Sequence, residues 1–330
     1  MKIAILGDGG WGTTLALLLS GKGLRPVLWG VFPAYVEEVR KKRKNPKFLP
    51  GFKIPESVIL DSDLRRVVHR ADLIVLAAPS QYVRGVARKI GRNDLEGKSF
   101  VSVAKGIETG TLCVPSEVVR EELGAVPFCV LSGPTIAREV ALKMPAAVSV
   151  ASKNEKLRRQ VREIFTTPYF SLYESDDVLG VELGGAIKNV IAISAGIVEG
   201  LGSGSNTRAA LFARGVAEMA RLGKAKGAKR ETFMGLSGLG DLATTCLSPH
   251  SRNRWLGEEI GKGKKLKDIL KSTEMVVEGV DTCRSAYKLA RRCRVRMPIT
   301  EAVYGILFRG RDPRAAVDAL MKRGFHHELD

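Results

Sequence analysis

Short apolar runs alternate with helix-like segments over the first half of the chain. The runs are rich in β-branched residues and end at glycine, proline or a polar residue, which is typical of buried strands. They cover residues 3–6, 25–30, 71–80, 99–104 and 128–131, and residues 146–151 and 170–173 are expected to be edge strands. Apolar strands that alternate with helices predict a parallel, doubly wound α/β sheet.

The pattern changes at residues 175–177, and beyond them the spacing is helical with no convincing strand. Residues 178–199 are almost wholly apolar and rich in small residues, so we expect a central helix there, with Asp176 or Asp177 as its N-cap. Residues 262–330 are typical of amphipathic helices, with a turn at Met297 and a disordered polar tail. We therefore predict two domains, an α/β domain over 1–177 and an all-α domain over 178–330.

A glycine-rich turn joins the first strand to the first helix. Gly7, Gly9 and Gly12 have the spacing G-x-G-x-x-G, and residues 13–19 favour a helix. In dinucleotide folds the first glycine permits a tight turn, the second lets the backbone approach the pyrophosphate, and the third lets the helix pack on the strand. Free N–H groups at the helix start would face the phosphates. The alternative is a chance turn, but this context favours a Rossmann-type domain for a nicotinamide dinucleotide.

The end of the second strand is where dinucleotide folds place the adenosine ribose, and an acid there binds a free 2′-hydroxyl. The segment Trp29-Gly30-Val31-Phe32-Pro33 contains no acid, and the basic run 40–44 follows it. This favours NADP(H), or weak discrimination between the two cofactors.

Ligands of such sheets bind beyond the carboxyl ends of the strands. We therefore expect Pro79, Lys105, Gly133 and Thr135 around one crevice with the glycine-rich turn. Lys105 could equally be an ordinary surface lysine after a strand.

Lys188 is unusual because it lies inside the apolar stretch 178–199. Lysine is almost never fully buried unless it is paired, and burial lowers its pKa. A lysine of this kind suits proton exchange with a hydroxyl or carbonyl group. The alternative is a lysine on the wet edge of the helix, with its stem directed outwards.

Residues 235–253 combine a glycine-rich turn, one acid and clustered hydroxyls before a polar helix. Ser251, Arg252 and Asn253 would form a good cradle for a phosphate or polyol, because arginine supplies a planar fork of donors. Asp241 could bind a catalytic lysine or a substrate hydroxyl. Alternatively, the stretch is a loop between helices with Ser251 as an ordinary N-cap.

The formal charge of +18 over 330 residues fits a nucleic-acid binder, a site for anionic compounds, or solvated helix faces. Because aromatic residues are not interleaved with the basic ones, we favour solvated helix faces for most of them. The five scattered cysteines indicate neither a metal site nor a disulfide framework. We expect no apolar run to be long enough to span a bilayer, and no basic leader is evident, so we expect a cytoplasmic protein.

Ordered motifs along nearly the whole chain resemble the bacterial NAD(P)-dependent glycerol-3-phosphate dehydrogenases. They are Gly-x-Gly-x-Trp-Gly-Thr-x-Leu-Ala at 7–16, Ala-x-Pro-Ser at 77–80, Lys-Gly-Ile at 105–107, Ser-Gly-Pro-Thr-x-Ala-x-Glu-Val at 132–140, Ala-x-Lys-Asn-Val-x-Ala at 186–192, Gly-Leu-Gly-Asp-Leu-x-x-Thr-Cys at 238–246, Ser-Arg-Asn at 251–253 and Val-Val-Glu-Gly at 276–279. One departure is Val31-Phe32, where many relatives carry His or Arg, and it leaves the 2′-phosphate partner open.

The resemblance implies a Rossmann domain followed by an all-helical domain, and reversible reduction of dihydroxyacetone phosphate to sn-glycerol 3-phosphate for phospholipid synthesis. Lys188 would donate or accept the proton at the C2 oxygen. The implied substrate-binding residues are Lys105, Gly133, Thr135, Lys188, Asp241, Ser251, Arg252 and Asn253. The expected cofactor-binding residues are Gly7, Gly9, Gly10, Trp11, Gly12, Lys105, Ala137, Arg252, Val276 and Glu278. The cofactor would be NADP(H), with NAD(H) as the alternative.

The expected partner is therefore a small phosphate compound, with no nucleic acid and no membrane insertion, and a homodimer is left open. Two other functions compete with this one. One is a related dehydrogenase acting on another 2-hydroxy or 2-keto substrate. The other is a cofactor-binding sensor or nucleic-acid-binding protein on a Rossmann fold, against which Lys188 and Ser251-Arg252-Asn253 argue.

Overall fold

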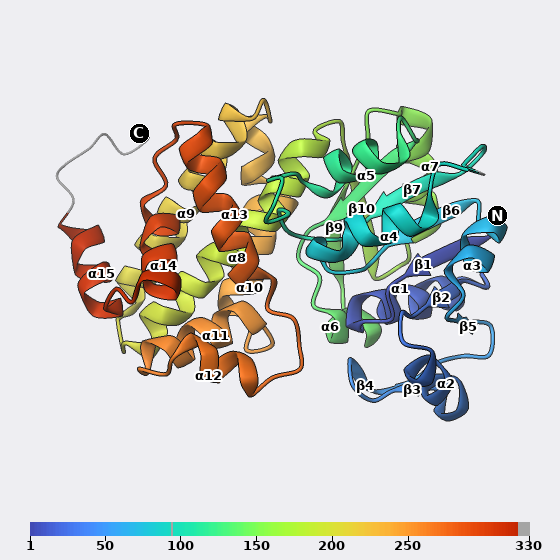
Figure 1. Ribbon diagram of the computed structural model, residues 1–330, viewed down its shortest axis with the longest axis horizontal. Helices are drawn as coiled ribbons and strands as arrows, with labels where there is room; N and C mark the ends of the chain where they lie inside the picture. Colours follow the sequence, from blue (N-terminus) through green and yellow to red (C-terminus); the bar gives the residue numbers. More distant parts are fainter. Residues whose placement is uncertain (94, 323–330) are drawn as a thin grey trace. The chain divides into compact units, whose positions relative to one another are not determined.

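The computed structural model describes residues 1–93 and 95–322, and the chain divides into two compact units (Figure 1). The first unit consists of Met1–Ala104 and Pro115–Val178. The second consists of Lys105–Val114 and the chain from Leu179 onward. Lys105 therefore belongs to the second unit, whereas a single boundary at residue 177 assigns it to the first.

An eight-stranded sheet forms the centre of the first unit, in the order β10-β9-β8-β7-β6-β1-β2-β5. Neighbouring strands are parallel except for the antiparallel pair β8 and β9. The strands are β1 (Ile3–Leu6), β2 (Val27–Trp29), β5 (Ile59–Asp61), β6 (Leu73–Leu76), β7 (Ser99–Ser102), β8 (Phe128–Ser132), β9 (Ala146–Ala151) and β10 (Phe170–Ser175). The predicted strand β10 lies at one edge. The prediction of an edge position is wrong for β9, because β10 pairs with it on its outer side, and β5 is an edge strand that was not predicted.

Helices follow most strands of the first unit and bury the sheet. They are α1 (Gly10–Gly21), α2 (Pro33–Lys42), α3 (Leu64–Arg70), η1 (Ser80–Tyr82), α4 (Val83–Ile90), α5 (Pro115–Leu123), α6 (Ala137–Ala141) and α7 (Glu155–Phe165). A small antiparallel sheet, β3 (Lys44–Asn45) and β4 (Leu49–Lys53), follows α2. All four residues of β1 and of β6 are buried, as expected for strands covered on both faces.

The second unit is helical, and its described part, residues 105–114 and 179–322, contains no strand. Its elements are α8 (Val178–Gly200), α9 (Ser205–Ala225), η2 (Arg230–Met234), η3 (Leu236–Gly240), α10 (Asp241–Leu247), α11 (Arg252–Gly261), α12 (Leu266–Lys271), α13 (Glu278–Arg292), α14 (Pro298–Arg309) and α15 (Pro313–Met321). Met297 caps α14, where a turn was predicted. The expected polar tail at residues 323–330 lies outside the described residues.

Helix α8 is the central helix of this unit, and every residue from Gly180 to Val198 is buried. Its small residues permit close packing: a Cβ at Gly196 would lie 2.0 Å from the Arg254 carbonyl oxygen of α11. By length and hydropathy alone α8 could cross a membrane, so the expectation that no apolar run is long enough is wrong. However, 94% of its most apolar window is buried inside the protein, which identifies it as a core helix.

A buried carboxylate of α9 binds the start of α14. The Glu218 carboxylate of α9 is buried and accepts hydrogen bonds from the backbone N–H groups of Ile299 and Thr300, at the first turn of α14.

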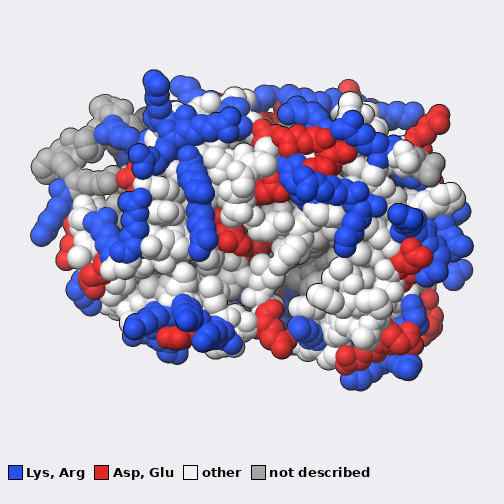
Figure 2. Space-filling model, in the orientation of Figure 1, with Lys and Arg blue, Asp and Glu red and all other residues white. Residues whose placement is uncertain are grey.

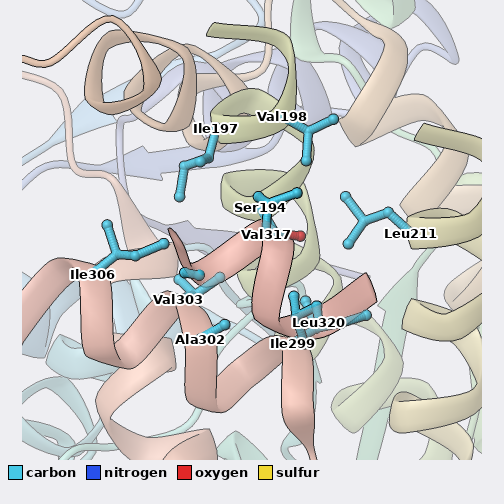
Figure 3. A pocket seen from close by; sticks show the side chains of 11 residues that line it. Ser194, Ile197, Val198, Leu211, Ile299, Ala302, Val303, Ile306, Val317 and Leu320 are labelled. Atoms are coloured by element: carbon cyan, nitrogen blue, oxygen red, sulfur yellow. The ribbon is translucent and has the colours of Figure 1, made fainter. Parts of the chain in front are cut away.

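A small apolar pocket lies between helices α8, α9, α14 and α15 (Figure 3). Among the described residues that line the pocket, only Ser194 has a polar side chain, and its hydroxyl donates to the Ile191 carbonyl oxygen within α8. We therefore interpret the pocket as imperfect packing of four helices.

Basic side chains are spread over the visible face of the molecule, with acidic residues among them (Figure 2). Several basic residues pair with acids one helical turn away, such as Lys42 with Glu38 and Lys262 with Glu258. Such i,i+4 pairs are typical of solvated helix faces.

Candidate active site

Gly7 and Gly12 show the tight turn and the close packing predicted for them, and the cofactor role of Gly9 stays a prediction. Gly7 has a φ of +134°, a backbone conformation that residues other than glycine rarely adopt. A Cβ at Gly12 would lie 1.9 Å from the Gly7 carbonyl oxygen, so the start of α1 packs directly on the turn. A Cβ at Gly9 would have no atom within 4 Å, which leaves the backbone open to a ligand.

Helix α1 begins at Gly10, and no side chain caps it. The first N–H groups of a helix have no partner within it, so this end is suited to an anion. The open backbone at Gly9 and the uncapped helix start therefore fit the pyrophosphate of a dinucleotide.

Other predicted residues of the first unit lie next to this turn or on a neighbouring loop. A Cβ at Gly10 would lie 3.8 Å from the Ala137 side chain at the start of α6, so these two predicted cofactor residues are neighbours. The Trp11 ring packs against Phe170, with ring centroids 6.1 Å apart. Thr135 donates its hydroxyl to the Gly133 carbonyl oxygen at 3.1 Å.

In the second unit, one buried carboxylate binds two lysines. Asp241, the first residue of α10, is 1% exposed. Its Oδ1 lies 2.7 Å from the Lys188 Nζ of α8, and its Oδ2 lies 2.6 Å from the Lys105 Nζ. Lys188 also donates to the Thr245 hydroxyl at 2.6 Å. The hydroxyl can accept because its own proton goes to the Asp241 carbonyl oxygen.

Both open questions about the lysines are answered by these contacts. Lys188 is 7% exposed and paired with a carboxylate, so the alternative of an outward-directed lysine is wrong. Lys105 is not an ordinary surface lysine either, since its side chain is only 15% exposed and pairs with Asp241. The predicted contact between Asp241 and Lys188 is confirmed.

The Lys105–Asp241–Lys188 group carries an excess of one positive charge when both lysines are protonated. The pKa of Lys105 is lowered to about 8: burial is the largest cause, the Lys188 charge acts in the same direction, and Asp241 opposes both effects. Two cations around one anion would attract a negatively charged substrate. The same group contains an ammonium able to donate a proton to a substrate oxygen.

A chain of amide hydrogen bonds fixes the surroundings of this group. Asn189, next to Lys188 on α8, donates to the Lys105 carbonyl oxygen at 3.3 Å and accepts from Asn253 Nδ2 at 2.9 Å. Asn253 in turn accepts from the Gly279 N–H at 3.0 Å. These bonds connect Lys105, α8, α11 and the start of α13.

The other predicted residues of the second unit lie at two helix starts. Ser251 caps α11 by accepting from the Arg254 N–H at 3.2 Å, as its alternative interpretation predicted. Arg252 donates to the Val276 carbonyl oxygen at 2.6 Å, so these two predicted cofactor residues meet. Glu278 is the first residue of α13, and its charge acts on Lys105.

Sequence reasoning missed Thr245 and Asn189. Thr245 is four residues after Asp241, which places the two side chains on the same helix face. Asn189 is adjacent to Lys188. Both residues stand inside the motifs quoted above, and this spacing was the available signal. Among the described residues, no group of three or more His, Cys, Asp or Glu side chains could hold a metal ion.

Comparisons with known proteins agree over the whole chain. Two family models match: the N-terminus of NAD-dependent glycerol-3-phosphate dehydrogenase at residues 2–158, and its C-terminus at residues 177–318. A glycerol-3-phosphate dehydrogenase (NAD(P)+) of Syntrophotalea carbinolica is 50% identical and covers 100% of both chains. One from Geobacillus kaustophilus is 47% identical over 100% of this chain and 96% of its own.

Among solved structures, glycerol-3-phosphate dehydrogenase from Coxiella burnetii has a TM-score of 0.95 and 38% identity, covering 98% of this chain and 99% of its own. The predicted architecture, a Rossmann-type domain followed by an all-α domain, is confirmed. The chain belongs to the NAD-dependent glycerol-3-phosphate dehydrogenase family.

Proposed function

We propose that this chain catalyses the reversible NAD(P)H-dependent reduction of dihydroxyacetone phosphate to sn-glycerol 3-phosphate. The observation that carries the proposal is the buried Lys105–Asp241–Lys188 group, which combines a proton donor with an excess of positive charge. The names of the relatives support the same reaction.

In this proposal Lys188 is the general acid. Its ammonium donates a proton to the C2 oxygen of the ketone as hydride reaches C2, and in the reverse direction the neutral amine takes the hydroxyl proton. Asp241 and Thr245 support this role, because their oxygens lie 2.7 Å and 2.6 Å from Nζ and orient the ammonium. NAD(P)H, when bound, supplies the hydride.

The substrate is proposed to bind basic, hydroxyl and amide groups that the sequence motifs single out. Lys105 contributes charge. Arg252 uses one amino group on the Val276 carbonyl oxygen, which fixes the guanidinium. The Ser251 hydroxyl accepts from a backbone N–H and keeps its own proton for donation. Gly133 and Thr135 of the first unit, and Asn253 of the second, complete the proposed set.

The cofactor is proposed to bind the first unit through the glycine-rich turn. The backbone at Gly9 and the start of α1 would hold the pyrophosphate, with Gly10, Trp11 and Ala137 beside it. Arg252, Val276, Glu278 and Lys105 are the proposed cofactor contacts of the second unit. We further propose a cytoplasmic enzyme that supplies glycerol phosphate for phospholipid synthesis. No nucleic acid or membrane insertion enters the proposal, and a homodimer stays a prediction.

The direct test is the oxidation of NADH and of NADPH with dihydroxyacetone phosphate as acceptor. The reaction is monitored through the loss of nicotinamide absorbance. We expect turnover with at least one cofactor, and glycerol phosphate as the product. If the folded protein binds cofactor but reduces a different keto compound instead, the substrate assignment is wrong and the related-dehydrogenase alternative is correct.

A further inference from the structure

The end of β2 lacks an acid in the sequence, yet the structure places a carboxylate there. Asp8 is the residue after Gly7 in the glycine-rich turn, and Gly30 is the residue after β2. A Cβ built on Gly30 would lie 2.3 Å from Asp8 Oδ2. The Asp8 carboxylate therefore occupies the space in which a side chain at position 30 would begin.

One oxygen of this carboxylate lacks a partner. Asp8 Oδ2 is buried and has no hydrogen-bond partner among residues 1–93 and 95–322. Burial raises the pKa of Asp8, and a hydrogen bond from its own backbone N–H opposes this effect. A buried carboxylate oxygen without a donor costs free energy, so a ligand that brings a donor would be favoured at this position.

The turn around Asp8 is held in place. The Asp8 carbonyl oxygen accepts from Asn45 Nδ2 at 2.7 Å and from the Thr13 hydroxyl at 3.3 Å. Asn45 is fully buried and also binds the Tyr35 hydroxyl at 2.6 Å. The backbone that carries the carboxylate is thus held in place within the first unit.

The basic run after β2 is largely occupied elsewhere. Arg40 donates to the Leu60 carbonyl oxygen at 2.7 Å and pairs with Glu37. Lys42 pairs with Glu38 at 2.7 Å. Arg43 donates to the carbonyl oxygens of residues 54 and 58, at 3.1 Å and 3.0 Å. These three side chains are therefore already bound to groups other than a ligand phosphate.

We propose that Asp8 is the residue that makes this chain select NAD(H) over NADP(H). The inference rests on the proposed function. The adenosine ribose of a dinucleotide lies at the end of the second strand, where an acid accepts hydrogen bonds from the free hydroxyls and repels a 2′-phosphate. Asp8 performs from the glycine-rich turn the task that an acid on β2 performs in other dinucleotide folds.

The test is a set of dissociation constants for NADH and NADPH, measured by calorimetry on the full chain. One hydrogen bond to a charged group corresponds to about tenfold or more in affinity, so we expect NADH to bind at least about tenfold more tightly. Asp8→Ala should weaken NADH binding and strengthen NADPH binding. Asp8→Asn keeps an acceptor oxygen, so it should mainly strengthen NADPH binding. Glu163→Gln removes the same charge from an exposed position of α7 and should leave the ratio unchanged.

A second variant moves the carboxylate without removing it. Gly30→Ala should displace the Asp8 carboxylate and reduce the preference for NADH in the same direction. If Asp8 were merely structural, its variants would weaken the binding of NADH and of NADPH equally, and that result would overturn the proposal. Tighter binding of NADPH than of NADH by the unaltered chain would also overturn it. If the unaltered chain binds neither cofactor, the proposed function itself fails.

Discussion

The Lys188 ammonium and the Asp241 carboxylate form a buried ion pair with a separation of 2.7 Å, although 53 positions separate them in the sequence. Asp241 is shared with Lys105, so its single negative charge does not neutralise both lysines. An isolated buried ammonium would tend to lose its proton. The carboxylate raises the pKa of Lys105 against the effect of burial, and it holds the Lys188 Nζ by a hydrogen bond.

Replacing Lys188 with alanine should remove the general acid. We expect kcat for dihydroxyacetone phosphate reduction to fall by roughly 10²–10⁴-fold, the usual contribution of acid–base catalysis. Steady-state kinetics measures this effect, and cofactor affinity should stay near that of the unaltered chain. Lys267→Ala removes an exposed lysine of α12 and serves as the control. A near-normal kcat in Lys188→Ala would exclude the proposed role.

Replacing Asp241 with asparagine should be harmful in two ways. It keeps the shape of the side chain but leaves two buried ammonium groups facing a neutral amide. Removing one member of a buried ion pair typically costs about 3–5 kcal/mol, so the free energy of unfolding in denaturant should drop by about that amount. The pKa of Lys105 should also fall, since Asp241 raises it. Asp268→Asn, at an exposed position of α12, is the control, and equal stability of the two variants would contradict this account.

Lys105 should make substrate capture depend on pH. Its pKa is lowered to about 8, so the side chain is cationic below pH 8 and becomes neutral above it. The substrate phosphate is already doubly charged above about pH 7, because its second pKa is near 6. KM for dihydroxyacetone phosphate should therefore rise as the pH passes 8. Lys105→Arg stays charged and should flatten the rise. A rise of the same size in Lys105→Arg would assign the titration to another group.

The sequence predicted the main elements of the first unit well, because their signals are local. The glycine spacing and the apolar runs at β1 and β6 are read within a few residues. Strand β5 was not predicted, because only three of its residues pair with β2 and one of them is an aspartate. The position of β9 inside the sheet also depends on a partner, β10, that only the tertiary fold specifies.

The candidate site was predictable in part. Lys188 stood out because a lysine in an apolar helix needs a partner, and Asp241 was named as a possible one. That the same carboxylate also binds Lys105 depends on the segment Lys105–Val114 joining the second unit, which no local pattern indicates. The Asp8 carboxylate could not be placed at the end of β2 by sequence, because the usual signal for that position is an acid on the strand itself.

Gly9 and Gly12 should respond differently to alanine. A Cβ at Gly12 would overlap the Gly7 carbonyl oxygen, so Gly12→Ala should destabilise the first unit and abolish cofactor binding. A Cβ at Gly9 meets no atom of the protein, so Gly9→Ala should retain its stability and lose cofactor affinity by obstructing the pyrophosphate. Thermal unfolding and calorimetry separate the two effects. Gly85→Ala, at a position with equal open space in α4, should change neither, and unaltered affinity in Gly9→Ala would contradict the proposed phosphate site.

Glu218 should make stability depend on pH in the direction opposite to that of most carboxylates. Burial raises its pKa to about 7, although hydrogen bonds from the backbone N–H groups of Ile299 and Thr300 oppose the effect. Between the ordinary pKa of glutamate and pH 7, the unfolded chain ionises this group while the folded chain keeps it protonated. Its contribution to stability is therefore complete below about pH 4, near the unfolded-state pKa, and is lost as the pH rises through 7. Denaturant unfolding across this range should show the loss, and Glu218→Gln, which cannot ionise, should remove it. If the free energy of unfolding fell with pH equally steeply in Glu218→Gln and in the unaltered chain, other groups would control this pH dependence.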